Sequence, residues 1–129
     1  MLESKSIQVD SLIFTALIRY KTAMMRKASI YMLGKLAGYL TESADKKSYL
    51  FEYVEDYHGL PISLTMPVEK QTFSFDHFPP FFDGVLPEGM MLEGLLRRLK
   101  IDKRDYFTQL LAVGGDLVGA VTVKPFANE

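Results

Sequence analysis

The sequence predicts an α+β domain, with a small, mainly antiparallel sheet of four to five strands and two helices late in the chain. Three observations support this class. In the first half of the chain, apolar and polar residues alternate with the period of two that strands require. In the last third, apolar residues recur at helical spacing. Glycine and proline separate these segments, and strands followed by helices favour an α+β arrangement over alternating β and α units.

The early strand patterns start with a hairpin. The runs 28–33 and 36–40 are separated by residues 34–35, a two-residue break typical of a tight turn. After a polar loop, aromatic residues alternate with other residues over 49–54, which predicts a third strand. A short alternating run over 62–66, ended by a proline, predicts a fourth.

Two helices and a last strand are predicted for the C-terminal third. Leucines at helical spacing, followed by a basic cluster, predict a helix over 88–99. Asp102 is expected to cap a second helix, which Gly114 and Gly115 end. The apolar run 117–123 then predicts a buried strand.

Length and composition fit one globular domain. The chain has 129 residues, of which 48% are hydrophobic and 24% charged, and domains commonly hold about 100–150 residues. Fifteen basic and sixteen acidic side chains leave a net charge of −1, which argues against direct nucleic-acid binding because that binding needs a basic surface. Cysteine is absent, which excludes disulfides and thiolate chemistry and suits a reducing compartment. We therefore expect a cytoplasmic protein.

The first 25 residues differ in pattern from the rest of the chain. Their longest apolar cluster, residues 12–18, is much shorter than the about 20 residues that span a bilayer. Acidic residues offset the positive charge that a signal peptide carries before its apolar part. We therefore expect no membrane association. The expected organisation is an N-terminal appendage over 1–25, the domain over 26–124 and a C-terminal tail over 125–129.

No pattern in the sequence supports catalysis, a metal site or a cofactor site. His58 and His77 lack the spacing of a metal-ligand motif. No serine lies in a Gly-x-Ser-x-Gly elbow. The glycines within 114–119 follow a helix and precede a strand, the reverse of the order that directs backbone amides at phosphate. We expect no catalytic residue, no metal and no cofactor, ATP included.

A phenylalanine-rich segment, residues 67–85, is predicted to be a loop because prolines and a glycine interrupt it. Phe78, Phe81 and Phe82 flank or follow a proline pair, and the sequence leaves open whether they fill a core under the loop or stand outside it. Base stacking on these rings is disfavoured because it needs a basic groove, and Lys70 is the only positive residue in the segment.

Phe73 and Phe75 differ from the other phenylalanines of this segment because polar residues surround them. We expect both rings to be exposed, and an exposed aromatic in such a setting is a candidate anchor for a protein interface. The predicted partner-binding residues are Phe73, Phe75, Gln71, Ser74 and Asp76.

Several motifs together resemble the N-terminal domain of the HipA family. In chain order they are Gly38-Tyr39-Leu40, Phe51-Glu52-Tyr53, Pro61-Ile62-Ser63-Leu64-Thr65-Met66-Pro67, Phe82-Asp83-Gly84-Val85-Leu86-Pro87-Glu88-Gly89 and Gly114-Gly115-Asp116-Leu117-Val118-Gly119-Ala120-Val121. The similarity covers about residues 26–124. HipA proteins are bacterial Ser/Thr kinase toxins of toxin–antitoxin modules, in which this domain precedes the kinase core. The ATP-binding loop, catalytic aspartate and metal-binding motif of that core are not found in this sequence.

A free-standing copy of this domain resembles HipS, the small subunit of three-component HipBST modules. The resemblance implies a non-catalytic antitoxin that binds and inhibits a HipA- or HipT-type Ser/Thr kinase, with a HipB-like helix-turn-helix protein as a further partner in the complex. It also implies that the loop after residues 61–67 lies against the kinase nucleotide site and inserts an aromatic, typically tryptophan. This chain has no tryptophan, so Phe73 is the first candidate for the inserted ring and Phe75 the second.

The resemblance also allows a different role. The chain would then be a regulatory or scaffolding N-terminal domain of a HipA-type kinase whose catalytic core is on another chain or has been removed.

Overall fold

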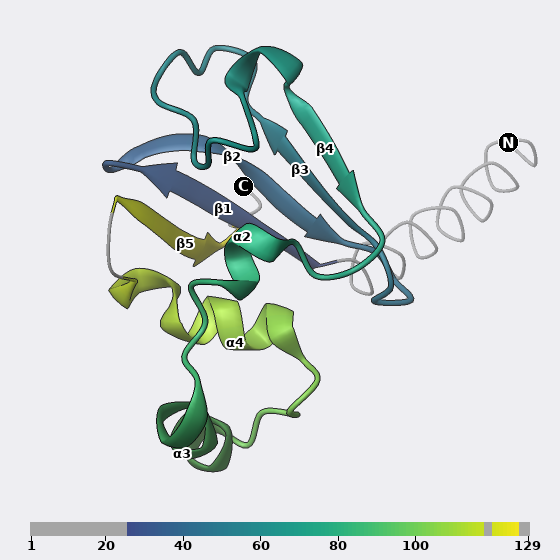
Figure 1. Cartoon of the computed structure of the whole chain (residues 1–129), viewed down its shortest axis with the longest axis vertical. Coiled ribbons are helices and arrows are strands. Elements are labelled where there is room, and N and C mark those ends of the chain that lie inside the picture. The colour runs from purple at the N-terminus through teal and green to yellow at the C-terminus, as the bar shows by residue number, and fades with distance from the viewer. Residues whose placement is uncertain (1–25, 118–119, 127–129) are drawn as a thin grey trace, which may run out of the picture.

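The alternating segments of the first half form most of a five-stranded antiparallel sheet (Figure 1). The computed structural model describes residues 26–117 and 120–126, so the predicted N-terminal appendage lies outside the described residues. The strands are β1 (Arg26–Met32), β2 (Lys35–Glu42), β3 (Tyr49–Tyr53), β4 (Thr72–Phe75) and β5 (Val121–Pro125), in the order β4-β3-β2-β1-β5. The predicted α+β class with an antiparallel sheet is confirmed.

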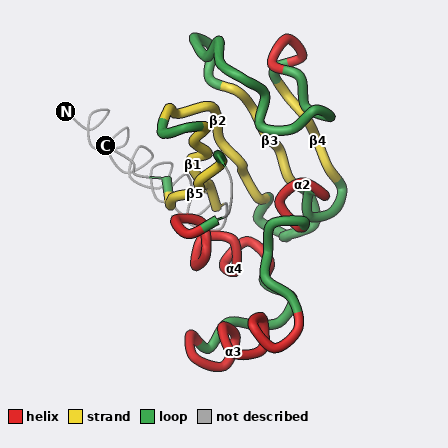
Figure 2. Tube along the Cα trace, turned by 60° about the vertical axis from the view of Figure 1, so that its left-hand side comes forward, coloured by secondary structure: helices red, strands yellow, loops and turns green. Residues whose placement is uncertain are grey.

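The helices follow late in the chain. They are α2 (Pro80–Asp83), α3 (Gly89–Leu99) and α4 (Tyr106–Val113), with 3₁₀ turns η1 (Val68–Lys70) and η2 (Gly114–Asp116). In both ribbon views α2 and α4 lie beside the sheet, whereas α3 is set apart from it (Figures 1 and 2).

The predicted helix over 88–99 is confirmed as α3, whereas the start of the next helix was predicted wrongly. Asp105, not Asp102, caps α4, because the Asp105 side chain accepts a hydrogen bond from the Thr108 backbone N–H at 3.2 Å. Asp102 instead accepts from the backbone N–H of Arg104 at 2.7 Å, in the turn before the helix. The predicted last strand is β5, but it begins at Val121 rather than at 117, and residues 118–119 of the predicted run lie outside the described residues.

The predicted hairpin is confirmed as β1 and β2, with its turn one residue earlier than expected. Leu33 and Gly34 form the turn, and both have positive φ, as two-residue hairpin turns require. Further along β2, Gly38 lies so close to β3 that a Cβ atom there would overlap the Glu52 carbonyl oxygen and the Phe51 ring. The close approach of these two strands therefore depends on glycine at position 38.

The strand predicted over residues 62–66 is wrong, and the segment forms turns. Its buried ends, Ile62 and Met66, bond to a side chain instead of a neighbouring strand. The Tyr53 hydroxyl accepts from the Ile62 N–H at 3.0 Å and donates to the Met66 carbonyl at 2.6 Å. The fourth strand is β4, inside the segment that was predicted to be a loop.

The core lies between the sheet and the helices α2 and α4. Its largest fully buried side chains include Ile30, Leu40, Phe51, Phe82, Phe107 and Leu110. Two of the phenylalanines whose burial the sequence left open are core residues. Phe82 is fully buried, and Phe78 packs edge-on against Tyr49 with ring centroids 5.4 Å apart. Phe81 is partly buried against the same core.

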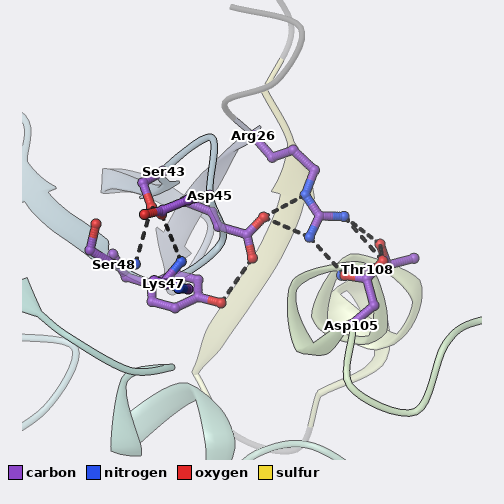
Figure 3. Close-up of polar contacts among 9 residues, drawn as sticks. Arg26, Ser43, Asp45, Lys47, Ser48, Asp105 and Thr108 are labelled. Carbon is purple, nitrogen blue, oxygen red and sulfur yellow. Dashed lines mark hydrogen bonds and ion pairs between the residues drawn. The ribbon is translucent and has the colours of Figure 1, made fainter. Parts of the chain in front are cut away.

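A polar network joins the sheet to α4 (Figure 3). The Arg26 guanidinium donates to Glu42 Oε1 at 2.8 Å, Asp105 Oδ1 at 2.7 Å and Thr108 Oγ1 at 2.6 Å. The second Glu42 oxygen accepts from the Tyr49 hydroxyl at 2.8 Å. Burial and this bond raise the pKa of Tyr49. The network links β1, β2 and β3 to the first turn of α4.

This network predicts a loss of stability in acid. Burial opposes the ionisation of Asp105, but hydrogen bonds from Arg26 and Thr108 outweigh it and lower its pKa to about 2. An unfolded aspartate has a pKa of about 3.9, and solvent screening reduces the stabilisation of this partly exposed pair, so the folded state gains about 1–2 kcal/mol above pH 5 and loses it as the pH falls to about 2. Asp105→Asn, which can still cap the helix, should be less stable at pH 7 by a similar amount. Urea midpoints of both proteins should converge near pH 2, and parallel pH profiles would contradict the assignment.

Candidate partner-binding surface

The predicted partner-binding segment contains an edge strand. Among the described residues β4 pairs only with β3, with Phe73 opposite Phe51 and Phe75 opposite Tyr49. The Gln71 carbonyl accepts from the Tyr53 N–H at 2.9 Å, so residues 71, 73 and 75 direct their main-chain groups to β3. By the same alternation, Thr72 and Ser74 direct their N–H and C=O groups away from the sheet, which leaves an open edge.

Phe73 is not the exposed ring that its polar neighbours suggested. It is only 7% exposed, because the pleat of β4 turns it to the face of the sheet that carries Phe51. Its ring lies 6.5 Å from that of Phe51 and 6.2 Å from that of Tyr53, centroid to centroid. The Lys70 ammonium covers the Phe73 ring at 5.1 Å from its centroid. Phe73 is therefore a core residue.

Phe75 is partly buried and borders a hollow at the surface. The hollow has a volume of about 370 Å³ and is lined by Met66, Lys70, Phe73, Phe75 and Phe81, with Thr65, Ser74 and Pro80. Its wall is mainly apolar and aromatic, and the open edge of β4 runs beside it. An apolar side chain of another protein could enter here while its main chain bonds to the edge.

The other predicted contact residues lie along the same segment and are exposed. Gln71 has a positive φ of 67° and forms the corner between η1 and β4. Ser74 points to the opposite face of the sheet from Phe73 and Phe75. Asp76 hydrogen-bonds to His77 at 2.7 Å, and this bond lowers the pKa of Asp76. The five residues thus follow one strand but do not converge on one point.

Sequence reasoning missed residues that line the hollow, namely Thr65, Met66, Lys70, Pro80 and Phe81. The sequence did contain one indication that Phe73 and Phe75 line the same hollow. Thr72 to Phe75 alternate polar and aromatic residues in the period of a strand, which predicts that both phenylalanines share one face. The contribution of residues 65–66 could not be seen, because it depends on the turn that Tyr53 holds in place.

The histidines do not form a site. His58 is exposed in the loop after β3, and His77 contacts Asp76. Among the described residues, no three His, Cys, Asp or Glu side chains lie close enough together to hold a metal ion. In the same part of the chain, no helix is both long and apolar enough to cross a bilayer.

Comparison with known sequences gives one consistent result. The family model of the HipA N-terminal domain matches residues 28–124. An uncharacterized protein of Haemophilus influenzae is 33% identical over 101 residues, which cover 78% of this chain and 93% of that protein. The Ser/Thr-protein kinase toxin HipA of Shewanella oneidensis is 26% identical, over 81% of this chain but 24% of the kinase. The putative kinase Y4mE of Sinorhizobium fredii is 27% identical, over 26% of its length.

Solved structures agree with this result. A structure described as the N-terminal domain of HipA toxin superposes with a TM-score of 0.63 at 29% identity, over 81% of this chain and 95% of that one. HipA in its complex with HipB and operator DNA, from S. oneidensis, gives a TM-score of 0.61 at 23% identity. That match covers 78% of this chain and 24% of HipA, and at this identity it shows a shared fold.

Proposed function

This chain belongs to the HipA N-terminal domain family, and from that membership we propose that it is a non-catalytic, antitoxin-like protein that binds and inhibits a HipA- or HipT-type Ser/Thr kinase. One observation carries the proposal. The domain accounts for about a quarter of each kinase relative but for 93% of the H. influenzae protein, so the family includes a small protein consisting almost entirely of this domain. A separate copy of the domain that forms part of these kinases is suited to making similar contacts with a kinase.

The edge of β4 and the adjacent hollow support binding rather than chemistry. Thr72 and Ser74 offer main-chain donors and acceptors, and the hollow beside Phe75 accepts an apolar side chain. Gln71 and Asp76 add exposed polar groups at the two ends of the strand. In this proposal the kinase contacts β4, and a HipB-like helix-turn-helix protein joins the complex, as HipB does in the S. oneidensis assembly.

Phe75→Ala is expected to abolish inhibition while the protein stays folded. Both predicted anchors line the hollow, but Phe73 is buried and Phe75 is the more exposed ring. Truncating an aromatic anchor commonly costs about 2 kcal/mol or more of binding. The kinase is co-expressed with wild-type or variant protein, and growth is scored together with recovery of the complex in a pull-down. Growth arrest should return with Phe75→Ala, while some complex is retained through the rest of the domain.

Tyr39→Ala is the matched control, since Tyr39 is also a partly buried aromatic on a strand but packs edge-on against Phe126, on the opposite face of the sheet. It should inhibit as wild type does. Full neutralisation of the kinase by Phe75→Ala would exclude this surface as the inhibitory element.

The alternative is a regulatory or scaffolding domain that works with a kinase core on a separate chain. The match to a quarter of each kinase supports this role, because in those proteins the domain is part of a larger kinase chain. The same co-expression separates the two roles. Inhibition predicts loss of kinase activity in the complex, whereas scaffolding predicts an active complex.

A further inference from the structure

Helix α3 has a large apolar surface that the rest of the domain does not cover. Of its eleven residues only Leu95 is buried. Met90 is 88% exposed, Met91 76% and Leu99 47%. The helix lies away from the sheet and is joined to the domain by extended connections on both sides (Figure 2). Met91 and Leu99 stand four residues before and after Leu95, so both flank it on one face of the helix, whereas Met90 lies on the face opposite Leu99. Exposed apolar side chains that gather on one face mark an interaction site more often than chance exposure.

A concave region adjoins α3. It has a volume of about 530 Å³, and its lining includes Val85, Leu95, Val113 and Leu117, with Met91 and Arg98 from the helix. The apolar walls come from α3, from the connection before it and from the end of α4. A partner side chain that enters this region would contact Met91 and Leu95.

Positive charge borders the apolar residues of α3. The stretch 97–104 holds five basic residues, Arg97, Arg98, Lys100, Lys103 and Arg104, and one acidic residue, Asp102. All five basic side chains are exposed, and none forms an ion pair with another described residue. The complementary surface is therefore apolar at its centre and carries carboxylates at its rim.

We infer that α3 is a second docking surface for the kinase, which meets Met91 and Leu99 with an apolar patch bordered by Asp and Glu. The identity of the partner rests on the proposed function. A lipid bilayer fits less well, because the region beside α3 is concave and a bilayer presents no side chain to fill it. Nucleic acid fits less well because α3 has no aromatic residue for stacking and its centre is apolar.

Two surfaces on one small domain separate two tasks. The α3 surface supplies affinity and steers association through charge, whereas the β4 edge with Phe75 reaches the part of the kinase where inhibition occurs. This division predicts that variants of α3 bind the kinase more weakly but inhibit it fully once bound. Phe75→Ala should instead retain some complex and fail to inhibit the kinase within it.

The test uses the full chain and the HipA-type kinase encoded by the same organism. Met91→Ser with Leu99→Ser should weaken binding at least tenfold, measured by titration of the purified kinase. Kinase activity at saturating variant should be as low as with wild type. Arg97→Glu with Arg98→Glu should slow association about tenfold at low salt, and the difference should shrink as salt is raised. Thermal melts confirm folding of both variants.

Leu33→Ser is the control, because Leu33 is 72% exposed at the tip of the β1–β2 hairpin and the change likewise removes an exposed apolar side chain. It should bind as wild type does. Failure of the wild-type chain to bind the kinase would overturn the proposed function and this inference together. Wild-type affinity in the Met91→Ser, Leu99→Ser variant would overturn this inference alone. If that variant also lost binding to phosphatidylserine vesicles that the wild type binds, α3 would be a membrane surface instead.

Discussion

Replacing Arg26 with alanine is expected to lower the free energy of unfolding by about 3 kcal/mol, because it leaves a buried carboxylate without its cation. The Glu42 side chain is 2% exposed and is held by Arg26 on one oxygen and by the Tyr49 hydroxyl on the other. Removal of one partner of a buried pair costs about 3–5 kcal/mol, and the lower value applies since the Arg26 side chain is still 25% exposed. Asp105 would lose the same partner at the start of α4.

Urea denaturation with two control variants tests this explanation. Lys27→Ala removes a neighbouring cation that only covers the Tyr39 and Phe126 rings, and should cost about 1 kcal/mol or less. Glu42→Leu in the Arg26→Ala background should recover part of the loss, because it removes the unpaired buried charge. If the double variant were no more stable than Arg26→Ala, the buried charge would not be the cause.

The sequence could not predict the Arg26 network, because its members are far apart along the chain. Arg26 and Asp105 are separated by 79 positions, and only the packing of α4 beside β1 brings them together. The hairpin and α3 were predictable for the opposite reason. The hairpin depends on a two-residue turn between strand patterns, and α3 depends on leucines at helical spacing, so both patterns are local.

Where two segments carried similar local patterns, distant residues decided between them. Residues 62–66 and 72–75 both alternate, yet only the second forms a strand. The Tyr53 hydroxyl hydrogen-bonds to the Ile62 N–H and to the Met66 carbonyl, so these backbone groups are not available for strand pairing. Distant residues also decide which aspartate caps α4. Asp102 and Asp105 are both residue types that cap helices. Hydrogen bonds with Arg26 and Thr108 fix Asp105 at the start of the helix.

The partner-binding surface was predictable as a segment but not residue by residue. The polar neighbours of Phe73 suggested exposure, whereas its burial depends on which face of β4 lies over Phe51. For α3 the helix itself was predictable, but not that its apolar stripe extends beyond what the domain covers. The exposure of Met91 and Leu99 follows from where the connections place the helix, and no local pattern encodes that position.

Phe73→Ala is expected to lower the free energy of unfolding by about 3 kcal/mol or more, because it empties a packed site between the Phe51 and Tyr53 rings. Inhibition of the kinase would then fall because folded protein is lost. Phe73→Leu, which keeps most of the volume, should cost about 1.5 kcal/mol or less and should still inhibit. Phe75→Ala, in contrast, should melt near the wild-type temperature and fail to inhibit.

Urea midpoints and growth assays of the three variants separate an anchor from a core residue. A core role for Phe73 predicts that inhibition follows stability across Ala, Leu and wild type, and that lowering the temperature restores inhibition by Phe73→Ala. An anchor role predicts loss of inhibition at unchanged stability. If Phe73→Ala stayed within about 1 kcal/mol of wild type yet left the kinase active, the ring would have to leave the core when the kinase binds, and Phe73 would then be the inserted residue rather than Phe75.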